Sequence, residues 1–321
     1  MARRRHKSWL RFRIIFFVTE QAVNLPETLA AAWQALSMAL RKVSTEAETE
    51  TRWLFQHVGC SLQDHRWQPE KPLTEAQRQF LSEALQRRQQ REPLQHILGT
   101  QAFRQLELVV SPHVLIPRPE TEELVERVLD YVRSLPVKGA EPLRVLDVGT
   151  GSGAIALALK TEYPALEVWA TDLSVEALQV ARLNAQQLDV SIDFRQGDGL
   201  FALDDALPVS FDVLVSNPPY IPHEELAGLE PEVRDHEPHQ ALVPQDPDPL
   251  FFYRHFAAEA PRFLKPGARA FFEIHSALGP ETLACFQPPV WSQVYLHQDL
   301  SQRPRFVEAL LADASQKKSE G

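Results

Sequence analysis

Two consecutive prolines, Pro218 and Pro219, follow the apolar run at residues 211–216 and stand between Asn217 and Tyr220. A residue that precedes a proline is held away from helical torsion angles, and each proline fixes its own φ. The segment is therefore predicted to be a rigid shelf with two hydrogen-bond acceptors, the side-chain oxygen of Asn217 and the carbonyl oxygen of Pro218. Such a shelf suits a planar group that carries NH2, with the ring of Tyr220 packed against its flat face.

The chemistry that this shelf favours is methyl transfer to nitrogen. Two acceptors that hold both N–H bonds orient the nitrogen for in-line attack on a methyl group, so that catalysis consists of positioning and electrostatic preorganisation. A sulfonium methyl donor is activated by its own positive charge, so neither a strong base nor a metal ion is required. A plain proline-rich turn would need neither Asn217 nor Tyr220, which counts against a purely structural role.

A glycine-rich loop further upstream follows another strand-like run and precedes a helical pattern. Its residues are Gly149, Thr150, Gly151, Ser152 and Gly153. Glycine tolerates positive φ and lets a ligand approach the backbone closely. The spacing also satisfies a dinucleotide-binding fingerprint, and a tight turn without any ligand has a similar composition. The loop alone does not identify what binds there.

Two acidic residues follow the next two strand-like runs. Asp172 stands where a carboxylate can accept hydrogen bonds from both ribose hydroxyls. Asp198, followed by Gly199, stands where a carboxylate can accept from an adenine amino group, with a simple turn aspartate as the alternative. These residues predict an adenosine-bearing ligand and suit NAD as well as S-adenosylmethionine. Because nothing near the shelf resembles the acid–base pair of hydride transfer, we predict S-adenosylmethionine as the cofactor.

The elements that must position these residues alternate along the chain. Strand-like runs alternate with helical patterns after residue 142, which is typical of an α/β fold with a doubly wound, mainly parallel sheet. Upstream, capping-box sequences at residues 45–48 and 74–77 predict helix starts in a small helical N-terminal domain. The predicted strands cover residues 144–148, 167–170, 192–195, 211–216 and 268–274, with a terminal pair near 294–296 and 306–311.

The composition limits the class of protein. Hydrophobic residues make up 44% of the 321 residues and charged residues 24%, which is typical of a globular chain with a sizeable core. The net charge of −10 counts against extensive electrostatic binding to nucleic acid. The only cysteines, Cys60 and Cys285, are far apart, so neither a disulfide framework nor a metal site is predicted, and a reducing, cytoplasmic location is expected. No apolar run is long enough to cross a bilayer.

The first 24 residues form a basic extension that carries six Lys/Arg and no acidic residue before Glu20. An organelle-targeting peptide, a basic tail and a start placed too far upstream all remain open for this stretch. If it directs the chain to an organelle, the substrate would belong to that organelle.

With these motifs in place, the sequence resembles the HemK-type protein-(glutamine-N5) methyltransferases, which modify peptide chain release factors. The motif at residues 217–220 alone would indicate methylation of some planar NH2 group, adenine in DNA included. The resemblance is more specific because further segments match in order, from about residue 27 to 311. The matching segments are residues 91–99, 115–122, 146–157, 216–221, 230–234 and 237–242.

The resemblance implies a domain organisation. It places a helical substrate-recognition domain at residues 25–98, a β-hairpin hinge at 99–118, and a methyltransferase domain at 119–314 with a Rossmann-like, seven-stranded, mostly parallel sheet. The basic extension at 1–24 and a polar tail at 315–321 flank these domains.

The resemblance also implies roles for the residues above. The loop at 149–153 would hold the methionine part of S-adenosylmethionine, Asp172 the ribose, and the segment at Asp198 and Gly199 the adenine. Asn217, Pro218, Pro219 and Tyr220 would grip the glutamine of the Gly-Gly-Gln motif in a release factor, with Asn217 also bordering the cofactor. Thr121 and Glu122, in a segment near the cofactor and the hinge, are secondary candidates.

Two segments depart from the family pattern, and two other substrates remain open. Residues 243–249 replace a glycine-rich stretch, and residues 299–306 carry Gln302 where the family has glycine. A ribosomal-protein glutamine would suit the same motif, whereas adenine N6 in nucleic acid predicts a basic recognition region that the charge disfavours. A cofactor-binding interaction protein without activity would not require Asn217 and Tyr220. We expect a monomer that binds a release factor and neither a membrane nor nucleic acid.

Overall fold

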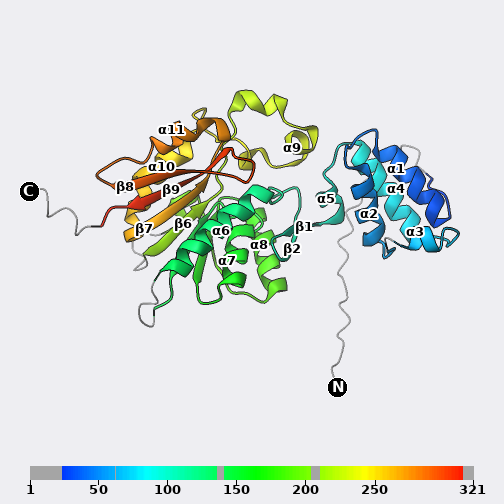
Figure 1. Cartoon of the computed structure of the whole chain (residues 1–321), viewed down its shortest axis with the longest axis horizontal. Helices are drawn as coiled ribbons and strands as arrows, with labels where there is room; N and C mark the ends of the chain where they lie inside the picture. Colours follow the sequence, from blue (N-terminus) through cyan, green and yellow to red (C-terminus); the bar gives the residue numbers. More distant parts are fainter. Residues whose placement is uncertain (1–23, 62, 136–140, 204–209, 314–321) are drawn as a thin grey trace, which may run out of the picture. The chain divides into compact units, whose positions relative to one another are not determined.

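The computed structural model describes residues 24–61, 63–135, 141–203 and 210–313 of the chain (Figure 1). The chain separates into two compact units, Met1–Gln90 and Arg91–Gly321. The predicted basic extension, apart from Asn24, and the predicted polar tail lie outside the described residues. No helix within the described ranges is both long and apolar enough to cross a membrane.

The first unit is helical, as the sequence predicts. The capping box at residues 74–77 is confirmed, because Gln77 N donates to the Thr74 side chain while the Gln77 side chain accepts from Thr74 N. The capping box predicted at residues 45–48 is wrong: the helix there begins after Glu46, whose amide donates to Ser44 Oγ at 3.0 Å instead. The helices are α1 (Leu29–Leu40), α2 (Ala47–His57), α3 (Asp64–Trp67) and α4 (Glu75–Gln89).

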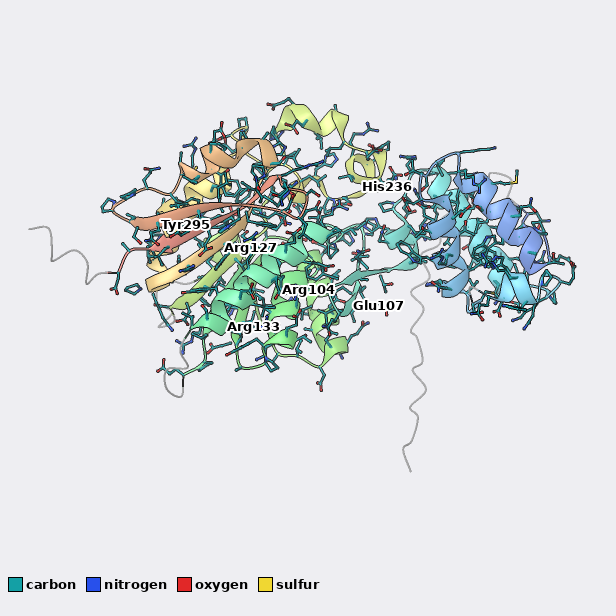
Figure 2. All side chains as sticks on the ribbon, in the orientation of Figure 1. Arg104, Glu107, Arg127, Arg133, His236 and Tyr295 are labelled. Atoms are coloured by element: carbon teal, nitrogen blue, oxygen red, sulfur yellow. The ribbon has the colours of Figure 1, made fainter. Side chains whose placement is uncertain are left out.

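The second unit opens with a short helix and the β-hairpin that the family resemblance implies. These elements are α5 (Leu94–Leu98), β1 (Thr100–Phe103) and β2 (Leu106–Val109). Arg104 in the hairpin turn (Figure 2) reaches the helices that follow, α6 (Pro119–Ser134) and α7 (Ala154–Glu162). Its guanidinium donates to the carbonyl of Glu122 at 3.0 Å and to Glu162 Oε2 at 2.8 Å. The hairpin is thereby fixed against one side of the unit.

A seven-stranded sheet forms the centre of the second unit, in the order β5-β4-β3-β6-β7-β9-β8. All pairings from β5 to β7 are parallel, and β9 runs antiparallel to both of its neighbours. The predicted doubly wound, mainly parallel sheet is confirmed. The strands are β3 (Arg144–Val148), β4 (Glu167–Asp172), β5 (Asp193–Gln196), β6 (Phe211–Ser216), β7 (Leu264–Glu273), β8 (Trp291–Gln298) and β9 (Pro304–Leu311).

Short helices complete the unit between and after the strands. The α-helices are α8 (Val175–Leu188), α9 (Pro231–His236), α10 (Phe251–Glu259) and α11 (Gly279–Leu283). The 3-10 helices are η1 (Gly199–Ala202), η2 (His223–Gly228), η3 (His239–Ala241), η4 (Ala260–Arg262) and η5 (Ser276–Leu278).

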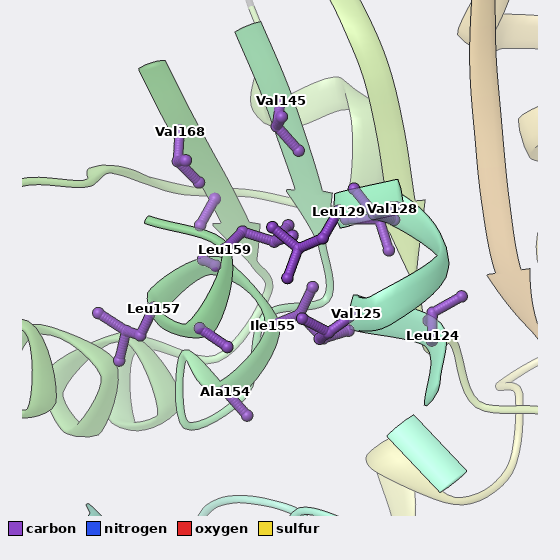
Figure 3. Close-up of a cluster of buried hydrophobic side chains, with 14 of the residues drawn as sticks. Leu124, Val125, Val128, Leu129, Val145, Ala154, Ile155, Leu157, Leu159 and Val168 are labelled. Atoms are coloured by element: carbon purple, nitrogen blue, oxygen red, sulfur yellow. The ribbon is translucent and has the colours of Figure 1, made fainter. Parts of the chain in front are cut away.

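Both faces of the sheet are buried at its central strands, which explains why β3 and β6 are almost continuously apolar. Side chains alternate along each strand, so Val145 enters the core under α6 and α7, whereas its neighbour Leu146 enters the core under α10. Figure 3 shows the first of these cores, where Leu129 of α6 and Leu159 of α7 lie close to Val145. The parallel pairing of β5, β4, β3, β6 and β7 places the carboxyl ends of these strands at one edge of the sheet (Figure 1).

The glycine-rich loop joins the end of β3 to α7 with a backbone that only glycine adopts readily. Gly153 has φ +85° and is the N-cap of α7. A Cβ added there would lie 2.8 Å from Leu157 Cδ1 and 3.3 Å from Ala181 Cβ. Two independent effects, left-handed torsion and close packing of the loop on α7 and α8, therefore require glycine at this position.

Replacing Gly153 with alanine should lower the thermal midpoint of unfolding more than replacing Gly99, whose φ of +77° is similar and whose added Cβ meets nothing within 4 Å. Both alanines carry a left-handed strain of roughly 1–2 kcal/mol, and Gly153→Ala adds overpacking of roughly 1–3 kcal/mol. Scanning calorimetry of the two variants measures the difference. Equal losses would contradict the crowding described for Gly153.

Candidate active site

A pocket opens at the carboxyl ends of β3, β4, β5 and β6, where the order of the strands reverses between β3 and β6. This is the place where doubly wound sheets bind ligands. The predicted site residues that line it are Gly149, Thr150, Gly151, Ser152, Asp172, Asp198, Gly199, Asn217, Pro218 and Pro219. Gly153 and Tyr220 stand behind the wall of the pocket, Gly153 against α7 and Tyr220 against the core under α10. Ligand contact by any of these residues stays a prediction.

The glycine loop is fixed to the neighbouring strand by its own amides. Gly149 N and Thr150 N both donate to the carbonyl of Thr171 at 2.9 Å, and Gly151 N donates to Asp172 Oδ2 at 2.8 Å. At Gly149 and Gly151 an added Cβ would meet nothing within 4 Å, so it would project into open space beside the pocket. The loop therefore presents bare backbone to a ligand.

Asp172 links this loop to the start of α8. Its Oδ1 accepts from Ser174 N at 2.9 Å while its Oδ2 accepts from Gly151 N. Burial raises the pKa of the Asp172 carboxyl, and these backbone hydrogen bonds oppose that shift. An ionised carboxylate has about four acceptor sites, so the Asp172 side chain can also accept from a ribose hydroxyl.

A second carboxylate, Asp147, lies beneath the loop and is completely buried. Its Oδ2 accepts from Thr150 Oγ1 at 2.6 Å and from Ala156 N at 3.2 Å. Its Oδ1 has no hydrogen-bond partner among the described residues. Burial raises the pKa of Asp147 to about 7, so the ionised form is costly in this environment. The side chain holds the loop to the first turn of α7 from inside the protein.

The proline shelf leaves β6 directly beside the glycine loop. Ser216 Oγ donates to the carbonyl of Val148 at 2.7 Å, which ties the ends of β6 and β3 together. Asn217 Nδ2 donates to Thr121 Oγ1 at 3.1 Å, and Thr121 Oγ1 donates to Glu273 Oε2 at 2.7 Å. The shelf is thus connected through α6 to the end of β7.

Glu273 also holds the far end of the shelf. Its Oε1 accepts from the Tyr220 hydroxyl at 2.9 Å, and its main-chain carbonyl accepts from the Tyr253 hydroxyl at 2.8 Å. Burial raises the pKa of the Glu273 carboxyl, whereas the Thr121 and Tyr220 hydroxyls and the charge of Arg305 favour its ionised form. Burial and the neighbouring Glu273 charge also raise the pKa of Tyr220 well above its usual value, so its hydroxyl is a proton donor.

An ion pair closes the opposite wall of the pocket. Arg118, the N-cap of α6, donates to both oxygens of the buried Glu237, at 2.7 and 2.8 Å. Glu237 directly follows α9 and precedes Pro238, Gln240 and Ala241, which line the pocket together with Arg118. A bidentate, half-buried pair of this kind fixes orientation as well as distance.

Three residues near the site were underestimated or missed by the sequence-based predictions. Thr121 contacts Asn217, whereas Glu122 does not line the pocket and offers its carbonyl to Arg104. Asp147 and Glu273 were not predicted as site residues. Asp147 lies within the apolar part of β3, and Glu273 directly follows the apolar run at residues 270–272 of β7; an acid in or next to a buried apolar run is the sequence signal that could have revealed both.

The two departures from the family pattern have different consequences. Gln302 adopts φ +63°, the left-handed conformation that glycine favours, so the turn between β8 and β9 keeps that backbone shape without glycine. Asp299 supports the same turn by accepting from Arg303 N at 2.9 Å. In the other segment, Gln245 lines the pocket, so this departure changes the wall of the site itself.

The strand order, the glycine loop, and the acidic and proline-rich strand ends define a Rossmann-like methyltransferase. The family model described as "Methyltransferase small domain" matches residues 131–229, and the one described as "PrmC N-terminal domain" matches residues 31–99.

Curated relatives agree with both matches. A release factor glutamine methyltransferase from Caulobacter vibrioides is 39% identical over 87% of this chain and 95% of its own length. Proteins of the same name from Bacteroides thetaiotaomicron and Streptomyces coelicolor are 37% and 44% identical, over 74% and 71% of this chain and 82% and 79% of their own lengths. The chain belongs to the release factor glutamine methyltransferase family.

Replacing Asp147 with asparagine should change stability in a pH-dependent way. The folded-state pKa of about 7 lies above the usual value for aspartate, so the wild-type protein loses stability as the pH rises through about 7. The asparagine does not titrate. We therefore expect the thermal midpoint of the variant, relative to wild type, to be higher at pH 8 than at pH 5 by roughly 3–8 °C.

Calorimetry at the two pH values measures this shift, with the exposed Asp130→Asn variant on α6 as the surface control. A difference between variant and wild type that is the same at both pH values would refute the buried-carboxylate interpretation.

Proposed function

We propose that this chain transfers a methyl group from S-adenosylmethionine to the side-chain amide nitrogen, N5, of the glutamine in the Gly-Gly-Gln motif of a peptide chain release factor. The observation that carries the proposal is that Asn217, Pro218 and Pro219 of the shelf line the same pocket as the glycine loop and Asp172. Membership of the release factor glutamine methyltransferase family supports the choice of substrate.

The residues of the pocket fit S-adenosylmethionine. The backbone of the loop at residues 149–153 is open to the methionine part, Asp172 has acceptor sites free for the ribose hydroxyls, and the exposed Asp198 with Gly199 borders the adenine end. When bound, S-adenosylmethionine supplies a methyl group on a positively charged sulfur. No group of three or more His, Cys, Asp or Glu that could hold a metal ion occurs among the described residues.

The shelf performs the remaining work by positioning. Asn217 Oδ1 and the carbonyl of Pro218 accept the two amide hydrogens of the substrate glutamine, and this draws electron density onto its nitrogen. The two prolines keep both acceptors in place without reorganisation during the reaction. Tyr220 lies behind the wall of the pocket, and the hydrogen bond from its hydroxyl to Glu273 fixes that end of the shelf. The nitrogen loses its proton after alkylation has made it acidic, so no strong base is needed.

A methyl-transfer assay tests the substrate. Purified protein and labelled S-adenosylmethionine are mixed with an unmodified release factor, or with the same factor in which the glutamine of Gly-Gly-Gln is replaced by alanine. We expect label in the intact factor alone. If neither factor is labelled although S-adenosylmethionine binds, the proposed substrate is wrong, and ribosomal proteins and nucleic acid are then assayed in the same way.

Replacing Asn217 with alanine removes one of the two acceptors. We expect kcat to fall by roughly 10²–10³-fold, because the acceptor is aligned with the reacting nitrogen. The Kd for S-adenosylmethionine, measured by calorimetry, should stay within about threefold because the loop and Asp172 carry most of that binding. Turnover close to wild type in this variant would eliminate the mechanism.

A further inference from the structure

The side chain of Asn217 has two nearly identical ends, and the mechanism works with only one of them facing the substrate. An oxygen accepts the hydrogens of the substrate amide, whereas an NH2 group would repel them. The partners of an amide decide which end faces which way. The partner of Asn217 behind the shelf is Thr121 Oγ1, at 3.1 Å.

Glu273 sets the direction of the hydrogen bond between Asn217 and Thr121. Glu273 Oε2 accepts the single hydroxyl hydrogen of Thr121 at 2.7 Å. Thr121 then has only lone pairs left for Asn217. The NH2 end of Asn217 must therefore face Thr121, and its Oδ1 is left for the pocket that Asn217 lines.

The second oxygen of the same carboxylate acts on the other end of the shelf. Tyr220 donates its hydroxyl to Glu273 Oε1 at 2.9 Å. The side chain of Glu273, which is 1% exposed, thus holds Asn217 through Thr121 and holds Tyr220 directly. A buried carboxylate destabilises a fold unless its oxygens accept hydrogen bonds. Here one oxygen accepts from the hydroxyl of Tyr220, which belongs to the shelf, and the other accepts from the hydroxyl of Thr121, which is hydrogen-bonded to Asn217.

We infer that Glu273 is a positioning residue which, through the Thr121 hydroxyl, sets the orientation of the Asn217 amide so that its oxygen faces the substrate nitrogen. This inference rests on the proposed function for its consequence, the loss of turnover. The orientation itself is a property of the free protein. Glu273 touches neither substrate nor cofactor, since it acts only through Thr121 and Tyr220.

Selective labelling makes the orientation measurable without any substrate. The chain contains three asparagines, Asn24, Asn184 and Asn217, so a sample labelled with 15N-asparagine gives three side-chain NH2 signals. Asn184 donates to the carbonyls of Val109 and Ser152, away from Glu273, and provides an internal control for the fold.

Three variants separate the hydroxyl from the shape of the side chain. Thr121→Val keeps the shape and removes the hydroxyl, whereas Thr121→Ser keeps the hydroxyl. Glu273→Gln keeps the shape but can donate to Thr121, which frees the Thr121 hydrogen to point at Asn217. In Thr121→Val and Glu273→Gln we expect the Asn217 NH2 signal to shift and to exchange with water several-fold faster. In Thr121→Ser it should match wild type, and the Asn184 signal should stay unchanged throughout.

Kinetics with release factor and S-adenosylmethionine supply the second readout. We expect kcat to fall by about 10–100-fold in Thr121→Val and Glu273→Gln, because the Asn217 oxygen is then no longer held toward the substrate nitrogen. The KM for S-adenosylmethionine should stay within about threefold, since the cofactor loop is untouched. Thr121→Ser should retain most of the wild-type kcat.

The two readouts distinguish the inference from the proposed function. An Asn217 signal that is the same in Thr121→Val, Glu273→Gln and wild type overturns the inference, even if the enzyme methylates release factor. If the protein methylates release factor, equal kcat values for Thr121→Ser and Thr121→Val overturn the inference as well. A signal that depends on Thr121 and Glu273, in a protein that does not methylate release factor, supports the orientation and rejects the proposed substrate.

Discussion

The hydrogen bond from Ser216 Oγ to the carbonyl of Val148 joins the ends of the parallel strands β6 and β3, at the point where the order of the strands in the sheet reverses. On one side of this bond the chain enters the glycine loop, and on the other side it enters the proline shelf. A parallel sheet places the carboxyl ends of its strands at one edge, so a cofactor and a substrate bound there are brought together by the topology itself. At this contact between β3 and β6, the shelf contributes a rigid backbone, whereas the loop contributes a backbone that is open to a ligand.

Three buried or half-buried carboxylates surround this contact, and each has different hydrogen-bond partners. Asp147 holds the loop to α7 from below, Asp172 holds the loop to α8 at the surface of the pocket, and Glu273 holds two hydroxyls behind the shelf. Burial raises the pKa of each carboxyl. The ionised forms therefore cost stability, and the hydrogen bonds that offset this cost also fix the geometry of the site.

Much of the fold is predictable from local patterns, because the central strands β3 and β6 are buried on both faces and form largely apolar runs. Residues 144–148 and 211–216 are strands with the bounds predicted for them. The capping box at residues 45–48 does not form: the Ser44 side chain accepts from Glu46 N, and the helix begins after Glu46 rather than after Thr45. Competition between nearby polar side chains of this kind is not visible in a short motif.

The sequence by itself determined the chemical types at the strand ends: glycines for an open backbone, an acid after β4, and an asparagine made rigid by two prolines. Each of these properties depends on residues adjacent in the chain. Tertiary structure alone decided the partners of those groups. Asn217 meets Thr121 from 96 residues away, and Thr121 meets Glu273 from 152 residues away. The direction of a hydrogen bond depends on what its partner can donate or accept, so the working orientation of Asn217 exists only once α6, β6 and β7 are packed together.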